Sequence, residues 1–242
     1  MNASKINMLL IVLSIVLCVN SNNVNASESI NQQQAPIILN ADNLKLDGKT
    51  GVFEHCGNAQ LTQLNIMIKA DCINGKRRED GGYDFIAAKG AAHLTQIDQI
   101  KKEKLDIKAE LIEYKIQEKQ FKVEKNADLE LSNENLDSVK ILANKIDLDN
   151  KNEQSRLISA NGSPLKIVLK KLGNIDLEAV SNQLIYNTGS SELKLAEDVI
   201  ANLELGQISA GLFEYNSKTK ESSFTRSSEQ QIEIIQQKKQ QP

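Results

Sequence analysis

Apolar and polar residues alternate along many short segments of this chain. The runs at residues 66–70, 127–131 and 165–169 each place an apolar side chain at every second position. A period of two is typical of a β-strand with one buried face. Residues 99–125 are rich in Lys and Glu and could also form a helix, but the alternation at 105–109 favours strands there too. The pattern therefore predicts an all-β protein.

Two short motifs recur along the chain and indicate an internal repeat. The first is an apolar residue, any residue and then Ala, and its copies end at Ala41, Ala70, Ala109, Ala143, Ala179 and Ala210. The second reads GNAQLTQ, GAAHLTQ, KNADLEL and NGSPLKI, with a weaker copy EDVIANL, and its copies begin at Gly57, Gly90, Lys125, Asn161 and Glu197. The copies lie roughly 35 residues apart, the length of a repeat unit.

A unit of this length holds only a few strands and cannot bury its own apolar face. Stacked units would bury one continuous apolar interior. Gly-, Asn- and Asp-rich turns separate the strand segments at intervals of roughly 8 to 15 residues, as in a sandwich or jelly roll. We therefore predict a sandwich or jelly roll of repeated strands with one long apolar interior.

The composition indicates which residues form the core and argues against one class of partner. Apolar residues make up 40% of the 242 residues, aromatic residues only 4%, and Trp is absent, so the core is expected to be aliphatic. The net charge is −3. A nucleic-acid-binding protein would carry a basic stripe, which this sequence lacks. We expect no nucleic acid among its partners.

The N-terminal residues have the features of an export signal. Lys5 precedes an apolar run at residues 8–19, which is shorter than the roughly 20 residues that span a bilayer. Small residues at Val24 and Ala26 fit a signal-peptidase site, so cleavage is expected after Ala26.

The predicted domain boundaries follow from this signal and from the repeat. We predict a signal peptide at residues 1–26, a flexible lead at 27–35, the jelly roll at 36–226 and a disordered Gln- and Lys-rich tail at 227–242.

The residues that commonly carry enzyme chemistry are isolated. His55 and His93 stand alone in strand-like segments, and Cys56 and Cys72 have no metal-type spacing. A nucleotide-binding loop is also missing. We expect no catalytic residues, no metal site and no cofactor, and hence no enzyme.

Residues 36–73 resemble the N-terminal core of the LptA/OstA-like lipopolysaccharide (LPS) transport proteins. The matching positions are Ile37, Leu39, Ala41, Asp42, Phe53, Gly57, Asn58, Thr62, Gln63, Ile66, Ile68, Ala70 and Asp71. The chain departs from the family pattern in having more repeat units, in Cys56 and Cys72, and in Leu64 where the hairpin turn usually has Gly.

The resemblance implies an elongated, twisted, open β-jelly roll of repeated antiparallel strands. It also implies that lipid A acyl chains bind inside this fold and that copies assemble head to tail between the inner and outer membranes. The implied partners are LPS, further copies of the chain, and the inner- and outer-membrane components of the transport system, and the implied location is the periplasm. Two alternatives remain open. One is an inner-membrane-anchored partner of the same system, and the other is a structural β-repeat protein that holds no lipid.

The alternation also predicts which side chains face inward. A two-residue turn at Gln63 and Leu64 would pair Leu61 with Ile66 and Ala59 with Ile68, all on one face. The predicted groove residues are Ile37, Leu39, Phe53, Ala59, Leu61, Ile66, Ile68, Leu94, Ile107, Leu129, Ile141, Leu165, Ile167, Leu203 and Ile208. Periodicity alone favours a filled core, and it is the resemblance that favours a lipid-binding groove.

Cys56 and Cys72 lie at the far ends of the first predicted hairpin. A turn centred on Leu64 would place them opposite each other and allow a disulfide. A turn centred between Gln63 and Leu64 would instead place Cys56 opposite Asp71, with the two thiols on different faces. A β-bulge would reconcile the two alignments. The sequence leaves the disulfide open.

Overall fold

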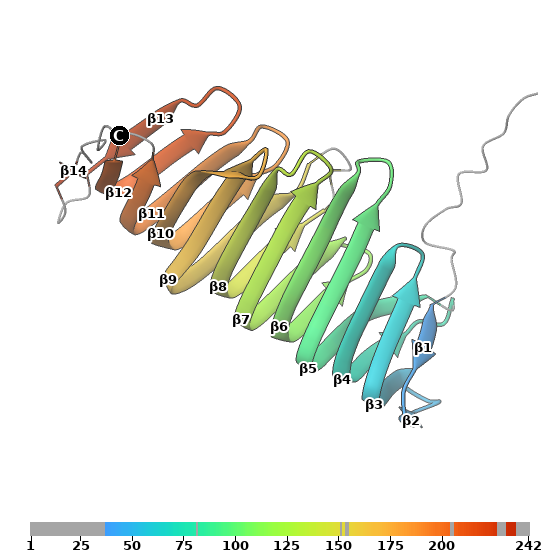
Figure 1. The fold of residues 1–242 in the computed structure, drawn as a ribbon. Coiled ribbons are helices and arrows are strands. Elements are labelled where there is room, and N and C mark those ends of the chain that lie inside the picture. Colours follow the sequence, from blue (N-terminus) through green and yellow to red (C-terminus); the bar gives the residue numbers. More distant parts are fainter. Residues whose placement is uncertain are drawn as a thin grey trace, which may run out of the picture. The chain divides into compact units, whose positions relative to one another are not determined.

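The computed structural model describes residues 37–226, except 81, 151, 153–154 and 204–205, and residues 231–235. The described residues belong to one compact unit, 36–242, and form a single 14-stranded antiparallel sheet. The sheet runs in chain order from β1 through β3 to β13, while β2 also pairs with β3 and β14 also pairs with β12 (Figure 1). The predicted all-β class and open antiparallel arrangement are confirmed.

The strand bounds are β1 (Ile38–Asn40), β2 (Asn43–Leu46), β3 (Val52–Gln63), β4 (Ile66–Arg77), β5 (Tyr83–Asp98), β6 (Glu103–Lys115), β7 (Gln120–Asn133), β8 (Ser138–Asp149), β9 (Leu157–Lys171), β10 (Asn174–Asn187), β11 (Glu192–Leu203), β12 (Gly206–Asn216), β13 (Ser222–Thr225) and β14 (Glu233–Ile235).

Every strand pair from β3–β4 to β11–β12 has a break in register near its middle. On four of the strands two consecutive residues there have positive φ, namely Gly57–Asn58, Gly90–Ala91, Lys125–Asn126 and Glu197–Asp198. These pairs are the opening residues of the second repeat motif. Such bulges bend a strand sharply. The repeat is therefore a row of aligned bulges, which we call the corner.

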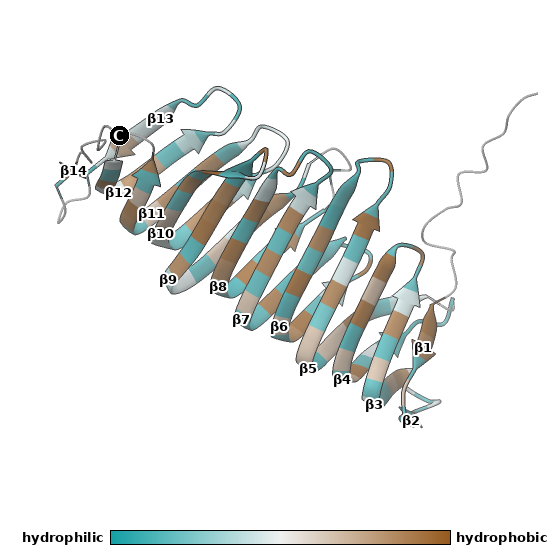
Figure 2. Ribbon diagram, viewed as in Figure 1, coloured by the Kyte–Doolittle hydropathy of each residue, from teal (hydrophilic) through white to brown (hydrophobic). Residues whose placement is uncertain are grey.

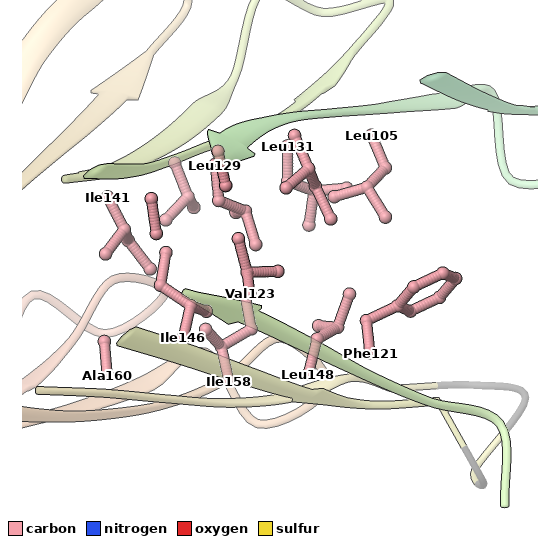
Figure 3. Packing of buried hydrophobic residues seen from close by; sticks show 14 of the residues in the cluster. Leu105, Phe121, Val123, Leu129, Leu131, Ile141, Ile146, Leu148, Ile158 and Ala160 are labelled. Atoms are coloured by element: carbon pink, nitrogen blue, oxygen red, sulfur yellow. The ribbon is translucent and has the colours of Figure 1, made fainter. Parts of the chain in front are cut away.

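The corner folds the sheet so that its two halves face each other (Figure 3). The strand residues within 59–70, 92–109, 127–143, 165–181 and 199–210, with β1 and β14, form what we call the first layer. The strand residues within 52–56, 72–89, 111–124, 145–161, 183–196 and 212–216, with β2 and β13, form the second layer. Each long strand thus contributes one half to each layer.

The core lies between these layers. Apolar and polar residues alternate as bands along the strands (Figure 2), and the apolar side chains point inward. Leu129 and Ile141 of the first layer are fully buried, as are Val123 and Ile146 of the second (Figure 3). Burying one such side chain stabilises the fold by about 1.5–3 kcal/mol. The repeated burial makes one continuous aliphatic core, as the composition predicts.

Polar side chains next to the corner link neighbouring strands. The Asn58 amide donates to Asp42 at 3.1 Å, and the Asn126 amide donates to Glu110 at 3.0 Å. In each case the acceptor directly follows the Ala of the first repeat motif. The two motifs are therefore the two sides of the corner on adjacent strands.

The first hairpin differs from its predicted register. Its turn lies at Leu64 and Asn65, so Leu61 pairs with Ile68 and Ala59 with Ala70, and the predicted pairings of Leu61 with Ile66 and of Ala59 with Ile68 are wrong. The turn requires a positive φ, which Leu64 adopts at 50°. The pairing partners shift by two positions, so the same side chains still point inward.

Several predicted segments lie outside the described residues. These are the signal peptide at 1–26, the lead at 27–35 and most of the tail at 227–242. Residues 233–235 of that tail form β14 beside residues 207–209 of β12, which differs from the disorder expected for them. No helix among the described residues is long and apolar enough to cross a membrane.

We predict that Gly90→Ala destabilises the protein by about 1–3 kcal/mol, because Gly90 has a φ of +74° and an added Cβ would overlap the Asp71 side chain. Gly48→Ala is the control, since an added Cβ there meets nothing within 4 Å. Urea denaturation measures the free energy of unfolding of both variants. Equal stability of the two variants would contradict a requirement for glycine at position 90.

Candidate functional site

The structure brings the predicted groove residues together on the inner face. Those that are buried are Phe53, Ala59, Leu61, Ile68, Leu94, Ile107, Leu129, Ile141, Leu165, Ile167 and Ile208. Ile37, Leu39, Ile66 and Leu203 are partly buried and pack against the core. The predicted set lies almost wholly in the first layer, with Phe53 as its exception.

The prediction missed the residues that face this set from the second layer. Phe121, Val123, Ile146, Leu148 and Ile158 project toward Leu129, Leu131 and Ile141 (Figure 3). Their own alternation is visible in the sequence, as in Ile146-Asp147-Leu148. Ile146, Leu148 and Ile158 were missed because the inward positions change phase at the corner, from 141 to 146 on β8 and from 160 to 165 on β9. On β7 the phase is kept, so Phe121 and Val123 share the parity of Leu129.

The interior is filled by these side chains. Leu94, Ile107, Leu129 and Ile141 each have 0% of their surface exposed, and they belong to one cluster that extends from β3 to β12. Protein interiors pack as densely as organic crystals. An alkyl chain can therefore enter only where the two layers are not joined, or by displacing side chains that now contact each other.

The hairpin ends of the two layers form what we call the mouth, on the side opposite the corner. One polar bridge joins the layers there. The guanidinium of Arg156, just before β9 in the second layer, contacts the carboxylate of Glu103, at the start of β6 in the first. Arg156 is only 5% exposed. A charge this buried needs a paired partner, so breaking this contact would leave an isolated charge.

A second bridge closes the mouth farther along the chain. The Tyr215 hydroxyl of β12 donates to Asp176 of β10 at 2.8 Å, and the Lys220 ammonium contacts the same carboxylate. Burial, together with this hydrogen bond to Asp176, raises the pKa of Tyr215. The bridge therefore depends on a neutral phenol.

Between the two bridges the mouth has a cavity of about 300 Å³. Glu103 and Asp176, the first-layer members of the two bridges, both line it. Its apolar lining includes Leu131, Val139 and Leu169, and the rest of its lining is mainly polar. The cavity therefore connects the solvent with the edge of the apolar core.

Cys56 and Cys72 pair directly across β3 and β4 and form a disulfide. The bulge at Gly57 and Asn58, opposite Asp71, brings them into register. Among the described residues, Glu54 and these two cysteines are the one group that could hold a metal ion, but a disulfide offers no thiolate. This cluster is therefore a covalent link and not a metal site.

The two histidines occupy different sides of the sheet. His93 lies 3.0 Å from Asp106 on the neighbouring strand, with its ring on the outer face. His55 packs edge-on against Phe53 and is partly desolvated, which lowers its pKa. Each imidazole ring therefore lies against a neighbouring side chain, Asp106 for His93 and Phe53 for His55.

Part of the chain is similar to known transport proteins. Residues 39–151 match the family model described as the LptA/(LptD N-terminal domain) LPS transport protein. No curated protein matches the chain. Among solved structures, one similar chain is LptH, described as the LptA-homologous periplasmic component of the LPS transport device of Pseudomonas aeruginosa. It is 19% identical over 55% of this chain and 86% of its own length, with a TM-score of 0.47.

We predict that the stability of the protein falls as the pH rises above about 10, the pKa of an unfolded tyrosine. The folded pKa of Tyr215 is raised, so the stability from its neutral form is complete below the unfolded pKa and is lost as the pH rises through the folded one. Thermal denaturation between pH 8 and pH 11 should show a smaller loss for Tyr215→Phe than for the unmodified protein.

At neutral pH, Tyr215→Phe should cost about 1.5–3 kcal/mol, because it removes one hydrogen bond to a carboxylate. Tyr114→Phe is the control. Tyr114 is also an aromatic residue of the inner face, and burial alone raises its pKa. Equal effects of the two substitutions at neutral pH would argue against the bridge to Asp176.

Proposed function

Because the chain belongs to the LptA/(LptD N-terminal domain) family of LPS transport proteins, we propose that it carries LPS through the periplasm with the acyl chains enclosed between its two layers. The family is one of transport proteins and not of enzymes, in agreement with the expectation from the sequence. Nothing in the proposed function requires a cofactor.

The observation that carries the proposal is the continuous apolar cluster inside the folded sheet. Buried apolar residues continue in this cluster from Leu61 on β3 to Phe213 on β12, and Ser181 on β10 is a buried polar residue beside them. Each methylene moved from water to such an environment gains about 0.8 kcal/mol, so a chain of about a dozen carbons gains roughly 10 kcal/mol. Part of that gain offsets the separation of side chains that now fill the interior.

The two ends of the sheet support assembly with further copies and with membrane partners. On β2, next to β3, Leu44 and Leu46 are 60% and 63% exposed, and at the other end Ile234 of β14 is 59% exposed. Edge strands offer backbone groups that can pair with another chain. Two different edges that pair with each other give a head-to-tail, open-ended assembly.

A second candidate function is a structural β-repeat without lipid. The 0% exposure of Leu94, Ile107 and Ile141 favours it, because a core this full stabilises the fold unaided. The two functions differ in whether an acyl chain reaches the inner face, and a crosslinking experiment separates them.

We predict that photo-leucine at position 129 captures LPS on irradiation, whereas photo-leucine at position 142 does not. Leu129 is fully buried between the layers, and Leu142 is 39% exposed on the outer face of the paired strand. The diazirine probe is close to leucine in size, so the core remains packed. Mass spectrometry of the adducts gives the result. Equal capture at both positions, or none at 129, would support the structural alternative.

Head-to-tail assembly predicts that the β2 edge of one copy lies beside the β13 edge of the next. Asn43→Cys on β2 and Ser223→Cys on β13 introduce thiols at exposed positions of these edges. Mixing the two variants with a short bis-maleimide should give mixed dimers in excess over dimers of either variant alone. A predominance of same-variant dimers would indicate a symmetric contact and overturn the head-to-tail model.

A further inference from the structure

We propose that the cavity in the mouth, between the Glu103–Arg156 and Asp176–Tyr215 bridges, binds the anionic head group of an amphiphile. In this arrangement the alkyl chain of the amphiphile enters the apolar interior past Leu131 and Leu169. The inference rests on the proposed lipid-carrying function and assigns to it a place of entry and a head-group preference.

The apolar lining of the cavity marks the edge of the core. Leu131, Val139 and Leu169 are 6%, 8% and 3% exposed, whereas Leu129 and Ile167, the next inward positions on β7 and β9, are 0% exposed. Solvent therefore reaches the core here through a gap between two bridges. An alkyl chain that entered at this gap would meet leucine and valine side chains first.

Three lysine residues line the cavity. Lys170 and Lys171 lie at the end of β9 in the first layer, and Lys218 follows β12 in the second. Lys218 donates to the Gly189 carbonyl at 2.9 Å. Within the described part of the chain, no carboxylate lies within ion-pair distance of Lys170 or Lys171. Lysines from both layers therefore line the cavity, and among the described residues Lys170 and Lys171 have no carboxylate partner.

The carboxylates of the cavity are already engaged. Glu103 is held by Arg156, and Asp176 is held by Lys220 and Tyr215. Asp137 accepts a hydrogen bond from the Leu172 backbone at 2.9 Å. With Arg156 and Lys220 included, five cationic side chains stand against three carboxylates. The balance favours an anion at the rim.

The volume suits the polar part of an amphiphile. About 300 Å³ lies at the lower end of the range of small-molecule pockets, enough for a phosphate or a phosphorylated sugar. A lipid-linked phosphate and free phosphate share this head-group chemistry. They differ in the alkyl chain, which only the lipid can place over the apolar lining.

Calorimetric titration of the full chain with three probes tests the site. Dodecyl phosphate carries both features, dodecyl maltoside has the chain without the charge, and inorganic phosphate has the charge without the chain. Each detergent is kept below its micelle concentration. The test variant is Lys170→Gln/Lys171→Gln. The matched control is Lys69→Gln/Lys108→Gln, which removes two lysines from the exposed outer face of the first layer.

We expect the test variant to bind dodecyl phosphate about tenfold more weakly than the unmodified protein, with dodecyl maltoside unaffected. The control variant should bind both detergents as the unmodified protein does. Of the two detergent complexes, higher salt should weaken only that of dodecyl phosphate. Inorganic phosphate should bind far more weakly than dodecyl phosphate, because it lacks the chain.

Three other results would each reject a different part of the proposal. If the test variant binds both detergents as well as the unmodified protein does, or loses affinity for both equally, the head-group site is wrong while the lipid-binding interior stands. If inorganic phosphate binds as tightly as dodecyl phosphate, the cavity is a site for free phosphate and not for an amphiphile. If neither detergent binds to any form, the proposed lipid-carrying function fails and this inference fails with it.

Discussion

Each long strand of this sheet carries apolar side chains on one face only, and that face has to be kept from water. The sheet covers it without any helix or second sheet among the described residues. It does so by bending every long strand at the same level, so that one half of each strand covers the other (Figure 3). The apolar core, the mouth and the two exposed edges all follow because the sheet buries its apolar face against itself.

The corner explains why the repeat has the residues it has. A bend at one level in every strand needs bulges in register, and the positive φ angles of those bulges favour Gly and Asn, as at Gly57, Asn58 and Gly90. The small Ala of the neighbouring strand and the polar residue after it fit against the bulge, as Asp42 does at Asn58. The conformational demand of the bend, and not a ligand, accounts for both motifs.

The same bend makes the two sides of the folded sheet different. At the corner the layers are joined by the backbone of every strand, and the core beside it is fully buried. At the mouth, side chains join the layers in the described part of the chain, where Arg156 contacts Glu103, and Tyr215 and Lys220 contact Asp176. Polar contacts of this kind can be exchanged for contacts with a polar head group, whereas the backbone hinge cannot open. The asymmetry between corner and mouth gives the apolar interior one side of access.

The sequence by itself determined the all-β class, the repeated strands and the inward residues of the first layer, from Leu61 to Ile208. It could do so because side chains point alternately to the two faces of a strand, so local periodicity records which face is apolar. It did not determine the turn at Leu64, the change of phase at the corner or the partners in the second layer. Glu103 and Arg156 are 53 positions apart in the chain. Their contact depends on the bend angle and on how successive strands stack, and these are set by packing across the whole sheet, so only the tertiary structure decided them.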